Sequence, residues 1–310
     1  MRLLIAEHDH GRYAELIRAA RPELELAASA DPVELAAAAG DCPLWLGQPD
    51  LLAPLLRQGL RPQWLQSTWA GITPLLAPDL RRDYRLSRAV GIFGQVMAEY
   101  VLGHLLAHER QLFARLAAQV EQRWEHGLPR SLAGRRALIV GCGDIGQAVA
   151  NFLQPFGVEL RGVASQTREQ APFVEVADLV DLPRLIAWAD YVINLLPDTP
   201  ATRDLYDARL LAHFRADAVL INAGRGVAVV DADLVAALEQ NKLAAAVIDV
   251  CREEPLPPGH AFWTAPRLLL TGHSSAPTDP LLMSELFIDN LRRWQAGEAL
   301  RGEVDFARGY

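Results

Sequence analysis

The chain has 310 residues, of which 51% are hydrophobic and 22% charged, and its formal net charge is −8 at pH 7. This length favours two domains, and the composition is that of a folded protein rather than a disordered one. The negative balance argues against a nucleic-acid partner, because binding phosphates takes a clustered excess of Lys and Arg.

The three cysteines, Cys42, Cys142 and Cys251, are far apart and odd in number. This favours reduced thiols over a disulfide framework or a zinc site. The apolar run within residues 1–8 is too short for the core of a signal peptide, and no stretch approaches the roughly 20 apolar residues that span a bilayer. We therefore expect a cytoplasmic protein without a membrane partner.

Short apolar strands alternate with helices in the first third of the chain. We expect strands at 3–6, 43–46 and 62–67 and a helix near 12–20. Such alternation predicts a parallel sheet covered by helices. From Val96 to Val120 the apolar spacing is helical with no interior Pro, which predicts one long helix at the domain boundary.

A second and larger alternating series begins at Ser131. Its expected strands are 137–140, 159–163, 191–196, 218–222, 245–250 and 268–271, with helices between most of them. A last helix, at about 281–296, is expected to return to the first unit. The sequence predicts two Rossmann-like, doubly wound α/β domains with a cleft between them. One is discontinuous and smaller, residues 1–95 and 277–310, and the other is residues 96–276.

A glycine-rich turn follows the apolar stretch Ala137-Leu-Ile-Val140. It reads Gly141-Cys-Gly143-Asp-Ile-Gly146 and leads into a helical segment. The first glycine permits a tight turn, the second lets a pyrophosphate approach the backbone, and the third lets helix and strand pack closely. The helix N-terminus offers N–H groups and a positive dipole end to the phosphates. This favours a dinucleotide-binding domain at 96–276 over a glycine turn without a ligand.

The stretch after the next strand bears on which dinucleotide binds. An NAD enzyme normally places Asp or Glu there for the ribose hydroxyls, whereas this chain has Val163-Ala-Ser-Gln-Thr-Arg168. Nothing in that stretch repels a 2′-phosphate, and Ser165, Thr167 and Arg168 can bind one. The sequence favours NADP(H), with NAD(H) as the alternative if Arg168 is only a solvated loop residue.

Three polar residues follow three successive strands of this domain, at the edge where open α/β sheets bind ligands. Arg225, in Ile221-Asn-Ala-Gly-Arg-Gly226, can hold a carboxylate bidentately and polarise a carbonyl. His273 can give a proton near neutral pH to the alkoxide that hydride transfer creates. Glu254 can keep that imidazolium populated. Each alone also fits a surface ion pair or a loop end, but their joint order predicts a catalytic set.

The order of these motifs resembles that of the D-isomer-specific 2-hydroxyacid dehydrogenases. The resemblance covers nearly the whole chain and rests on Gly141 to Gly146, Leu195-Leu-Pro-Asp-Thr-Pro200, Asn222-Ala-Gly-Arg-Gly226, Asp249 to Pro255 and 271–276. Within the family, Glu253-Glu-Pro-Leu-Pro, the missing acidic residue and the ending Val304-Asp-Phe-Ala-Arg-Gly-Tyr310 resemble the NADPH-linked glyoxylate/hydroxypyruvate reductase A branch. The resemblance implies NAD(P)H-dependent reduction of a small 2-keto acid, glyoxylate or hydroxypyruvate, to the 2-hydroxy acid.

The resemblance also implies roles for individual residues: Arg225 anchors the substrate, His273 is the acid/base and Glu254 is its partner. Residues 66–72 present backbone amides to the substrate carboxylate, and Trp45 walls the pocket, although a Trp there fits a core equally well. The implied substrate-binding residues are Trp45, Ala70, Gly71, Ile72, Arg225 and His273. The implied cofactor-binding residues are Gly141, Gly143, Asp144, Ile145, Gly146, Ser165, Thr167, Arg168, Leu196, Pro197, Thr202, Ala223, Arg225, Asp249 and His273, with Asp249 near the nicotinamide carboxamide.

Two positions depart from the family pattern. In Thr271-Gly-His273 a glycine stands where the family usually has Pro, which loosens the turn and puts the aim of His273 in question. Cys251-Arg252 precedes Glu254, and the sequence alone predicts no effect for this pair.

Two other functions remain alternatives at this stage. A nucleotide-sensing protein can use the same fold without turnover, although it needs no catalytic Arg, Glu and His. A dehydrogenase of a bulkier or phosphorylated D-2-hydroxy acid is the second. A basic cluster for a phosphate is not evident in the first domain beyond Arg81 and Arg82.

His104 and His108 lie one helical turn apart, but no Glu follows the first His as in zinc hydrolases, so we expect no metal. The helix near 96–120 is expected to form a dimer surface. This rests on its length, its Ala and Leu content and mainly on the resemblance, which implies a homodimer.

Overall fold

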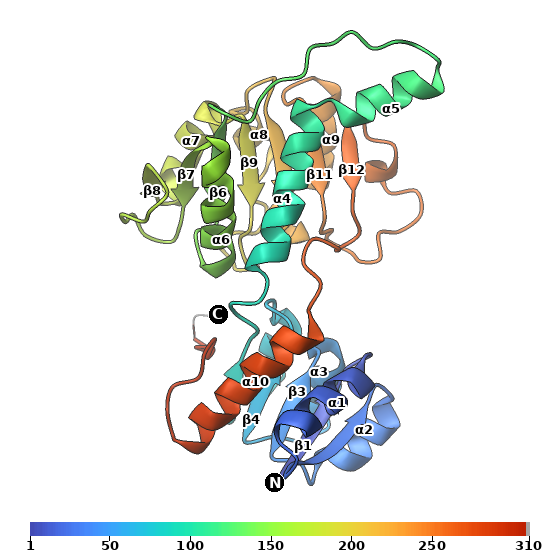
Figure 1. Cartoon of the computed structure of the whole chain (residues 1–310), viewed down its shortest axis with the longest axis vertical. Helices are drawn as coiled ribbons and strands as arrows, with labels where there is room; N and C mark the ends of the chain where they lie inside the picture. Colours follow the sequence, from blue (N-terminus) through green and yellow to red (C-terminus); the bar gives the residue numbers. More distant parts are fainter. Residues whose placement is uncertain (308–310) are drawn as a thin grey trace. The chain divides into compact units, whose positions relative to one another are not determined.

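The computed structural model describes residues 1–307 and divides into two compact units (Figure 1). Unit 1 contains Met1–Ile92 and the segment from Thr278 onward, and unit 2 contains Phe93–Pro277. The predicted boundaries, 95/96 and 276/277, lie within three residues of these. Residues 308–310, which end the stretch compared with the reductase A branch, lie outside the described residues. Among the helices of residues 1–307, none combines the length and apolar character needed to cross a membrane.

Unit 1 is built on a parallel sheet. Its strands are β1 (Arg2–Ala6), β2 (Glu25–Ser29), β3 (Leu44–Gly47), β4 (Trp64–Ser67) and β5 (Arg85–Ser87). Over the described residues they lie in the order β2-β1-β3-β4-β5. The connections wind in opposite directions on either side of the β1/β3 pair, and such a switch point is where doubly wound sheets bind ligands.

Helices cover both faces of this sheet. They are α1 (His10–Ala20), α2 (Pro32–Ala39), α3 (Pro49–Arg57) and α10 (Pro280–Gln295). The helix α10 packs beside α1, and Trp64 of β4 stacks on Phe287 of α10 with ring centroids 5.2 Å apart. Both rings are fully buried, so the C-terminal helix completes the core of unit 1.

Unit 2 contains a larger parallel sheet. Its strands are β6 (Arg136–Val140), β7 (Glu159–Val163), β8 (Glu175–Ala177), β9 (Tyr191–Asn194), β10 (Val219–Asn222), β11 (Ala245–Ile248) and β12 (Leu268–Leu270). Within the described residues their order is β12-β11-β10-β9-β6-β7-β8, the order of a dinucleotide-binding Rossmann fold with one strand added. The predicted fold class is therefore confirmed for both units.

The central strands of unit 2 are apolar runs because both faces of the sheet are buried. One face is covered by α4 (Gly94–Glu109) and α6 (Asp144–Leu153), which lie side by side in Figure 1. The other is covered by α7 (Leu182–Trp188), α8 (Ala208–Leu211) and α9 (Asp231–Glu239). These two cores hold the strand ends, and the turns that follow them, in fixed positions.

The single long helix predicted from Val96 to Val120 is wrong. The chain forms α4 and then α5 (Leu112–Val120), and Gln111 between them has a left-handed φ of +56°. At the end of α4, the buried carboxylate of Glu109 binds Arg130 (2.9 Å) and Arg135 (3.1 Å). The large apolar side chains of α5, Leu112, Phe113, Leu116 and Val120, do not continue the buried face of α4 but lie exposed. Apolar spacing alone cannot show this break.

Candidate active site

The glycine-rich turn joins β6 to α6 at the switch point of the larger sheet. Gly141 has φ +112°, a conformation that favours glycine. A Cβ on Gly146 would lie 2.0 Å from the carbonyl oxygen of Gly141, whereas a Cβ on Gly143 would meet nothing within 4 Å. Asp144 and Ile145 follow in the first turn of α6. At Gly146, the closed side of the turn, the helix packs tightly against the strand. At Gly143, the open side, there is space for a phosphate at the helix N-terminus.

Arg168, in the loop after β7, reaches back to this turn. Its guanidinium donates to the carbonyl oxygen of Cys142 (2.8 Å) and to the side chain of Gln170 (2.6 Å). Ser165 and Thr167 of the same loop are exposed. The guanidinium of Arg168 therefore lies beside the glycine-rich turn and is hydrogen-bonded to the backbone of that turn.

The loops after β9 and β10 approach each other closely. A Cβ on Gly224 would lie 2.8 Å from the carbonyl oxygen of Leu196, and both Leu196 and Ala223 are buried. The buried hydroxyl of Thr202 donates to the carbonyl oxygen of Pro197 (2.6 Å). The structure thus brings these two loops, with the predicted cofactor residues Leu196, Pro197, Thr202, Ala223 and Arg225, to the carboxyl edge of the sheet.

Asp249, directly after β11, fixes the turn that carries His273. Its buried carboxylate accepts hydrogen bonds from the Thr271 hydroxyl (2.6 Å) and from the N–H groups of Ser274 (2.8 Å) and Ser275 (3.2 Å). Its carbonyl oxygen accepts the N–H of His273 (2.6 Å). These four contacts join both ends of the turn to β11.

The glycine before His273 has a structural consequence. Gly272 and His273 both adopt left-handed φ values, +63° and +57°. A Pro at position 272 has φ near −65° and cannot adopt this conformation. The contacts from Asp249 hold the turn in place, so the glycine sets its shape rather than leaving it loose.

Glu254 and His273 are in direct contact. The Glu254 carboxylate lies 2.7 Å from Nδ1 of His273 and accepts the N–H of Cys251 at 2.7 Å. The hydrogen bond with Glu254 raises the pKa of His273 above 6.5, and partial burial offsets this only in part. Burial pushes the pKa of Glu254 upward, but the bonds from His273 and Cys251 outweigh it and the net shift is downward. The pair therefore favours a charged imidazolium beside a carboxylate.

Arg225 directly follows the Asn222-Ala-Gly224 turn after β10. It is partly buried, and its guanidinium donates to the carbonyl oxygen of Gly224 (2.5 Å). Its positive charge lowers the pKa of His273, although less strongly than Glu254 raises it. Arg225 and Glu254 therefore both lie within electrostatic range of His273.

In unit 1, the predicted substrate loop starts from a tightly held residue, Thr68. The N–H of Thr68 donates to the carbonyl oxygen of Gly47 (3.0 Å), and its carbonyl oxygen accepts the Thr278 hydroxyl (3.0 Å). Its hydroxyl donates to Glu7. The residues that follow differ in exposure: Ala70 and Gly71 are partly exposed, and Ile72 is buried.

Glu7, directly after β1, is a buried carboxylate beside the predicted substrate loop, and sequence reasoning did not single it out. Its carboxylate accepts hydrogen bonds from Thr68 and from the side chain of Gln48 (2.6 Å). Burial raises its pKa, while these hydrogen bonds act in the opposite direction. A cavity of about 330 Å³ adjoins it, lined by Glu7, His8, Asp9, Tyr13, Gln48, Trp69, Thr278 and Pro280. A carboxylate immediately after the apolar run 3–6 was the available signal.

Trp45, which the resemblance assigned to the pocket wall, lies in the interior of unit 1. Its side chain is 0% exposed and packs in the core of unit 1. Its indole N–H donates to the carbonyl oxygen of Cys42 (2.9 Å). This burial favours the alternative of a core residue.

His104 and His108 are engaged with aromatic rings. His104 packs edge-on against Tyr100 with centroids 4.4 Å apart, and His108 packs against Tyr191 at 5.9 Å. Burial lowers the pKa of both imidazoles. In the part of the chain that the structure describes, no group of three or more His, Cys, Asp or Glu side chains is arranged to hold a metal ion.

Comparison with known proteins agrees with this architecture. The sequence profile described as "D-isomer specific 2-hydroxyacid dehydrogenase, NAD binding domain" matches residues 102–275. The glyoxylate/hydroxypyruvate reductase A of Klebsiella pneumoniae strain 342 is 36% identical over 219 residues, covering 70% of each chain. That of Yersinia enterocolitica is 33% identical over 214 residues, covering 69% of this chain and 68% of the relative.

Solved structures extend the similarity to the whole chain. A D-isomer specific 2-hydroxyacid dehydrogenase family protein from Aeromonas salmonicida has a TM-score of 0.93 at 37% identity and covers 98% of this chain and 99% of its own. The NADPH-dependent glyoxylate/hydroxypyruvate reductase of Sinorhizobium meliloti, in complex with NADP and sulfate, has a TM-score of 0.87 at 27% identity, with 100% and 99% coverage.

The profile match and the fold define the class as a nicotinamide-dependent oxidoreductase of 2-hydroxy acids. More narrowly, the chain belongs to the D-isomer specific 2-hydroxyacid dehydrogenase family. The family resemblance found in the sequence is therefore confirmed.

Proposed function

We propose that this protein uses NADPH to reduce a small 2-keto acid, glyoxylate or hydroxypyruvate, to the 2-hydroxy acid. The observation that carries the proposal is the contact of 2.7 Å between Glu254 and His273, within electrostatic range of Arg225. Such a pair has the chemistry of an acid catalyst. The reductase A relatives bear the names of these substrates, which supports the same substrate class here.

The residues present fit a bound NADPH, which supplies the hydride. The open face at Gly143 and the N-terminus of α6 would hold the pyrophosphate. Arg168 would bind the 2′-phosphate, with Ser165 and Thr167 in the same loop. We retain Asp249 as the residue near the nicotinamide carboxamide. The S. meliloti relative was solved with NADP, which supports NADPH over NADH, with NADH as the weaker alternative.

Two groups are proposed to hold the substrate. Arg225 would bind the carboxylate through its planar guanidinium and polarise the keto oxygen. In unit 1, the backbone of Ala70, Gly71 and Ile72 would bind the carboxylate through its N–H groups. The contacts that fix Thr68 support this role, because they set where the loop begins.

His273 would give the proton. Its Nδ1 faces Glu254, so Nε2 is the nitrogen that protonates the keto oxygen as the hydride reaches the carbonyl carbon. The proton leaves a cation that Glu254 has stabilised, and the ring becomes neutral. Because the pKa of His273 is raised, the acid form persists to higher pH, and reduction declines as the pH rises through that pKa. Oxidation of the hydroxy acid needs the neutral ring and changes in the opposite sense.

The test is the loss of NADPH and, separately, NADH absorbance with glyoxylate, hydroxypyruvate and pyruvate. Wild-type protein is compared with His273→Ala and with His213→Ala, which removes an exposed histidine outside the proposed set. We expect rapid oxidation of NADPH with glyoxylate or hydroxypyruvate, a fall of about 10² to 10⁴ in kcat for His273→Ala and no change for His213→Ala. Binding of NADPH without turnover of any keto acid would instead favour the nucleotide sensor or a bulkier substrate.

We also propose that the protein works in the cytoplasm as a homodimer. The three cysteines are free thiols, which suits a reducing compartment. The dimer is supported by an exposed apolar row on α5 and the loop after it: Leu112 (53% exposed), Phe113 (58%), Leu116 (60%), Val120 (80%), Trp124 (82%) and Leu128 (86%). Exposed apolar side chains gathered along one segment are typical of surfaces that bind another protein.

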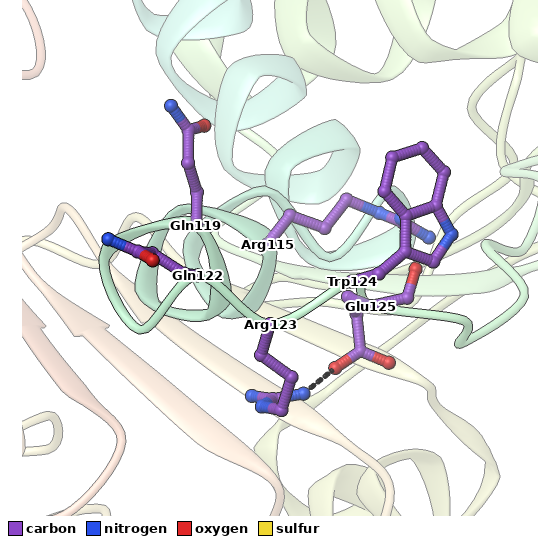
Figure 2. Close-up of a pocket in the computed structure, with 6 residues that line it drawn as sticks. All are labelled: Arg115, Gln119, Gln122, Arg123, Trp124 and Glu125. Atoms are coloured by element: carbon purple, nitrogen blue, oxygen red, sulfur yellow. Dashed lines mark hydrogen bonds and ion pairs between the residues drawn. The ribbon is translucent and has the colours of Figure 1, made fainter.

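Figure 2 shows a cavity beside Trp124, one residue of this row. A cavity of about 460 Å³ is lined by Arg115, Gln119, Gln122, Arg123, Trp124 and Glu125, and Arg123 pairs with Glu125 at 2.6 Å. Arg115 donates to the carbonyl oxygen of Gly127 (2.5 Å), so the loop folds back onto α5. Light scattering should give a dimer for wild type and a monomer for Leu116→Asp/Trp124→Ser, with Val180→Ser, an exposed apolar residue elsewhere, remaining dimeric. A monomeric wild type would refute the dimer.

A further inference from the structure

Arg252 joins the two turns that carry the proposed catalytic residues. It is the residue before Glu253-Glu254 whose effect the sequence did not predict. Its Nε donates to the carbonyl oxygen of Val229 at 2.8 Å, and its Nη2 donates to the carbonyl oxygens of Val229 and Val227, the latter at 3.2 Å. These carbonyls belong to the chain immediately after Arg225-Gly226.

Arg252 also forms two ion pairs. Nη2 pairs with Asp204, whose own N–H donates to Val227 at 2.9 Å, and Nε lies 3.6 Å from Asp231. Asp231 in turn lies 3.3 Å from Nε2 of His260. One guanidinium, 34% exposed, therefore contacts both the segment at 204 and the segment 227–231.

The backbones of the two turns are in direct contact at the same place. A Cβ on Gly226 would lie 2.0 Å from the carbonyl carbon of Cys251 and 2.5 Å from the nitrogen of Arg252. The Cys251 N–H then donates to Glu254, and Glu254 contacts His273. A continuous set of contacts runs from the Arg225 turn through Arg252 and Cys251 to His273.

We propose that Arg252 is a positioning residue that fixes the turn bearing Arg225 relative to the turn bearing Glu254, and through Glu254 orients His273. This inference rests on the proposed reductase function. The five donors of a guanidinium lie in a fixed plane and can bind several acceptors at once, which a lysine ammonium at the same place cannot reproduce. Loss of the contacts lets the substrate anchor and the proton donor move independently, and small displacements in a catalytic set are costly.

The first test is kinetic and compares Arg252→Gln and Arg252→Lys with Arg184→Gln. Arg184 makes similar surface ion pairs, to Glu175 and Asp181, away from the site. For Arg252→Gln we expect kcat/KM with glyoxylate to fall about tenfold or more, with a lower kcat, a higher KM for glyoxylate and an unchanged Kd for NADPH. Arg252→Lys should recover part of the loss, and Arg184→Gln should show none. Asp204→Asn, which keeps the carbonyl contacts, should cause a smaller fall of the same kind.

The second test does not need turnover. The imidazole of His273 is titrated by NMR and identified by its absence in His273→Gln. The charged groups that affect its pKa are Glu254 and Asp249, which raise it, and Arg225, which lowers it. In Arg252→Gln we expect the titration midpoint to move down toward the ordinary histidine value, while Arg184→Gln keeps the wild-type midpoint.

Two results would overturn the inference: an unchanged His273 titration in Arg252→Gln, or wild-type kinetics in that variant with only a lower melting temperature. The latter would show a purely structural ion pair. If wild-type protein reduces no keto acid, the proposed function fails, and the NMR titration still decides whether Arg252 orients His273.

Discussion

At the same topological position, unit 2 has a glycine-rich turn that is open to an anion, whereas unit 1 has a turn with a buried carboxylate. In unit 2 the chain leaves β6 through Gly141 to Gly146, with open space at Gly143. In unit 1 the chain leaves β1 through Glu7-His8-Asp9, and the Glu7 carboxylate is buried against Thr68 and Gln48. Both turns stand at the switch point of a doubly wound sheet. The fold provides the position, and the side chains decide whether an anion can bind there.

The carboxylates of Glu7 in unit 1 and Glu254 in unit 2 differ in their hydrogen-bond partners and in the direction of their pKa shifts. Glu7 is 5% exposed and accepts only neutral donors, so burial dominates and its pKa rises. Glu254 faces an imidazole that can carry a charge, and its pKa falls in spite of burial. A carboxylate that binds neutral groups holds the chain in place. A carboxylate that binds an acid can set the charge of that acid.

The largest expected effect tests the closed side of the glycine-rich turn. Gly146→Ala introduces a Cβ that would lie 2.0 Å from the Gly141 carbonyl oxygen, so helix and strand must move apart. We expect NADPH affinity, measured by calorimetry, to fall by about 10² or more, together with a lower melting temperature.

Gly143→Ala is the matched variant, because its Cβ meets no protein atom within 4 Å. We expect it to keep the wild-type melting temperature and still lose NADPH affinity, since the added methyl occupies the face open to the pyrophosphate. Unchanged affinity in Gly143→Ala would mean that phosphate does not approach this face, and the contrast between the two units would lose its basis.

The second prediction concerns Arg168, whose guanidinium lies beside the glycine-rich turn of unit 2. Arg168→Ala should weaken NADPH binding by about 10- to 100-fold, the equivalent of a charge-assisted hydrogen bond to phosphate, and leave NADH binding nearly unchanged. Gln170→Ala, which removes a neutral contact of Arg168, is the control and should have a smaller effect. Equal losses for NADH and NADPH would assign Arg168 to the structure of the turn rather than to the 2′-phosphate.

The sequence predicted the inner strands of both sheets and the edge strand β12. The stretch 159–163 was predicted with the observed bounds of β7, and β9 and β10 differed only at their ends. The edge strands β2, β5 and β8 were missed. The strands β5 and β8 have only three residues each and β2 is partly exposed, and Ala27, Ala28 and Arg85 give no apolar alternation to detect.

The candidate site was predictable where polar side chains follow successive strands in an order typical of the family. This holds for the contact between Glu254 and His273, which the structure shows directly. It does not hold for Glu7 or Arg252, because their roles depend on partners distant in sequence: Thr68 for Glu7, and Val227 and Val229 for Arg252. Trp45 shows the converse, since a residue type suited to a pocket wall was buried in the core.

The third prediction tests the carboxylate of unit 2. In Glu254→Gln the largest cause of the raised His273 pKa is removed, so that pKa should fall toward 6.5. The imidazolium is the proposed acid for reduction, so the decline of kcat/KM with rising pH should begin at lower pH. At pH 8 we expect a loss of about tenfold, with less at pH 6, where the ring is protonated in both proteins. Glu253→Gln removes an exposed neighbouring carboxylate and should keep the wild-type pH profile. An unshifted pH profile in Glu254→Gln would show that Glu254 does not control the pKa of the proposed acid.

The smallest effect is expected from the carboxylate of unit 1. Glu7→Gln keeps one acceptor oxygen but turns an amide toward the second donor, so Thr68 or Gln48 loses its partner. We expect a cost of about 1 to 3 kcal/mol in the free energy of unfolding, measured with urea at pH 7, and a rise of about threefold in KM for glyoxylate. Glu15→Gln, which disrupts an exposed pair with Arg12, should change neither.

The pH dependence of the stability lost in Glu7→Gln distinguishes a carboxylate with a raised pKa, such as Glu7, from one with a lowered pKa, such as Glu254. A carboxyl group whose folded pKa is raised destabilises the native state above that pKa, and the penalty is relieved as the pH falls toward 4.5. Wild type gains this stability between neutral and mildly acidic pH, whereas Glu7→Gln has no group to protonate. The difference in unfolding free energy between them should therefore widen from pH 7 to pH 5. A difference that narrows instead would show that Glu7 is stabilised in its ionised form, as Glu254 is, and the contrast between the two sheet edges would be lost.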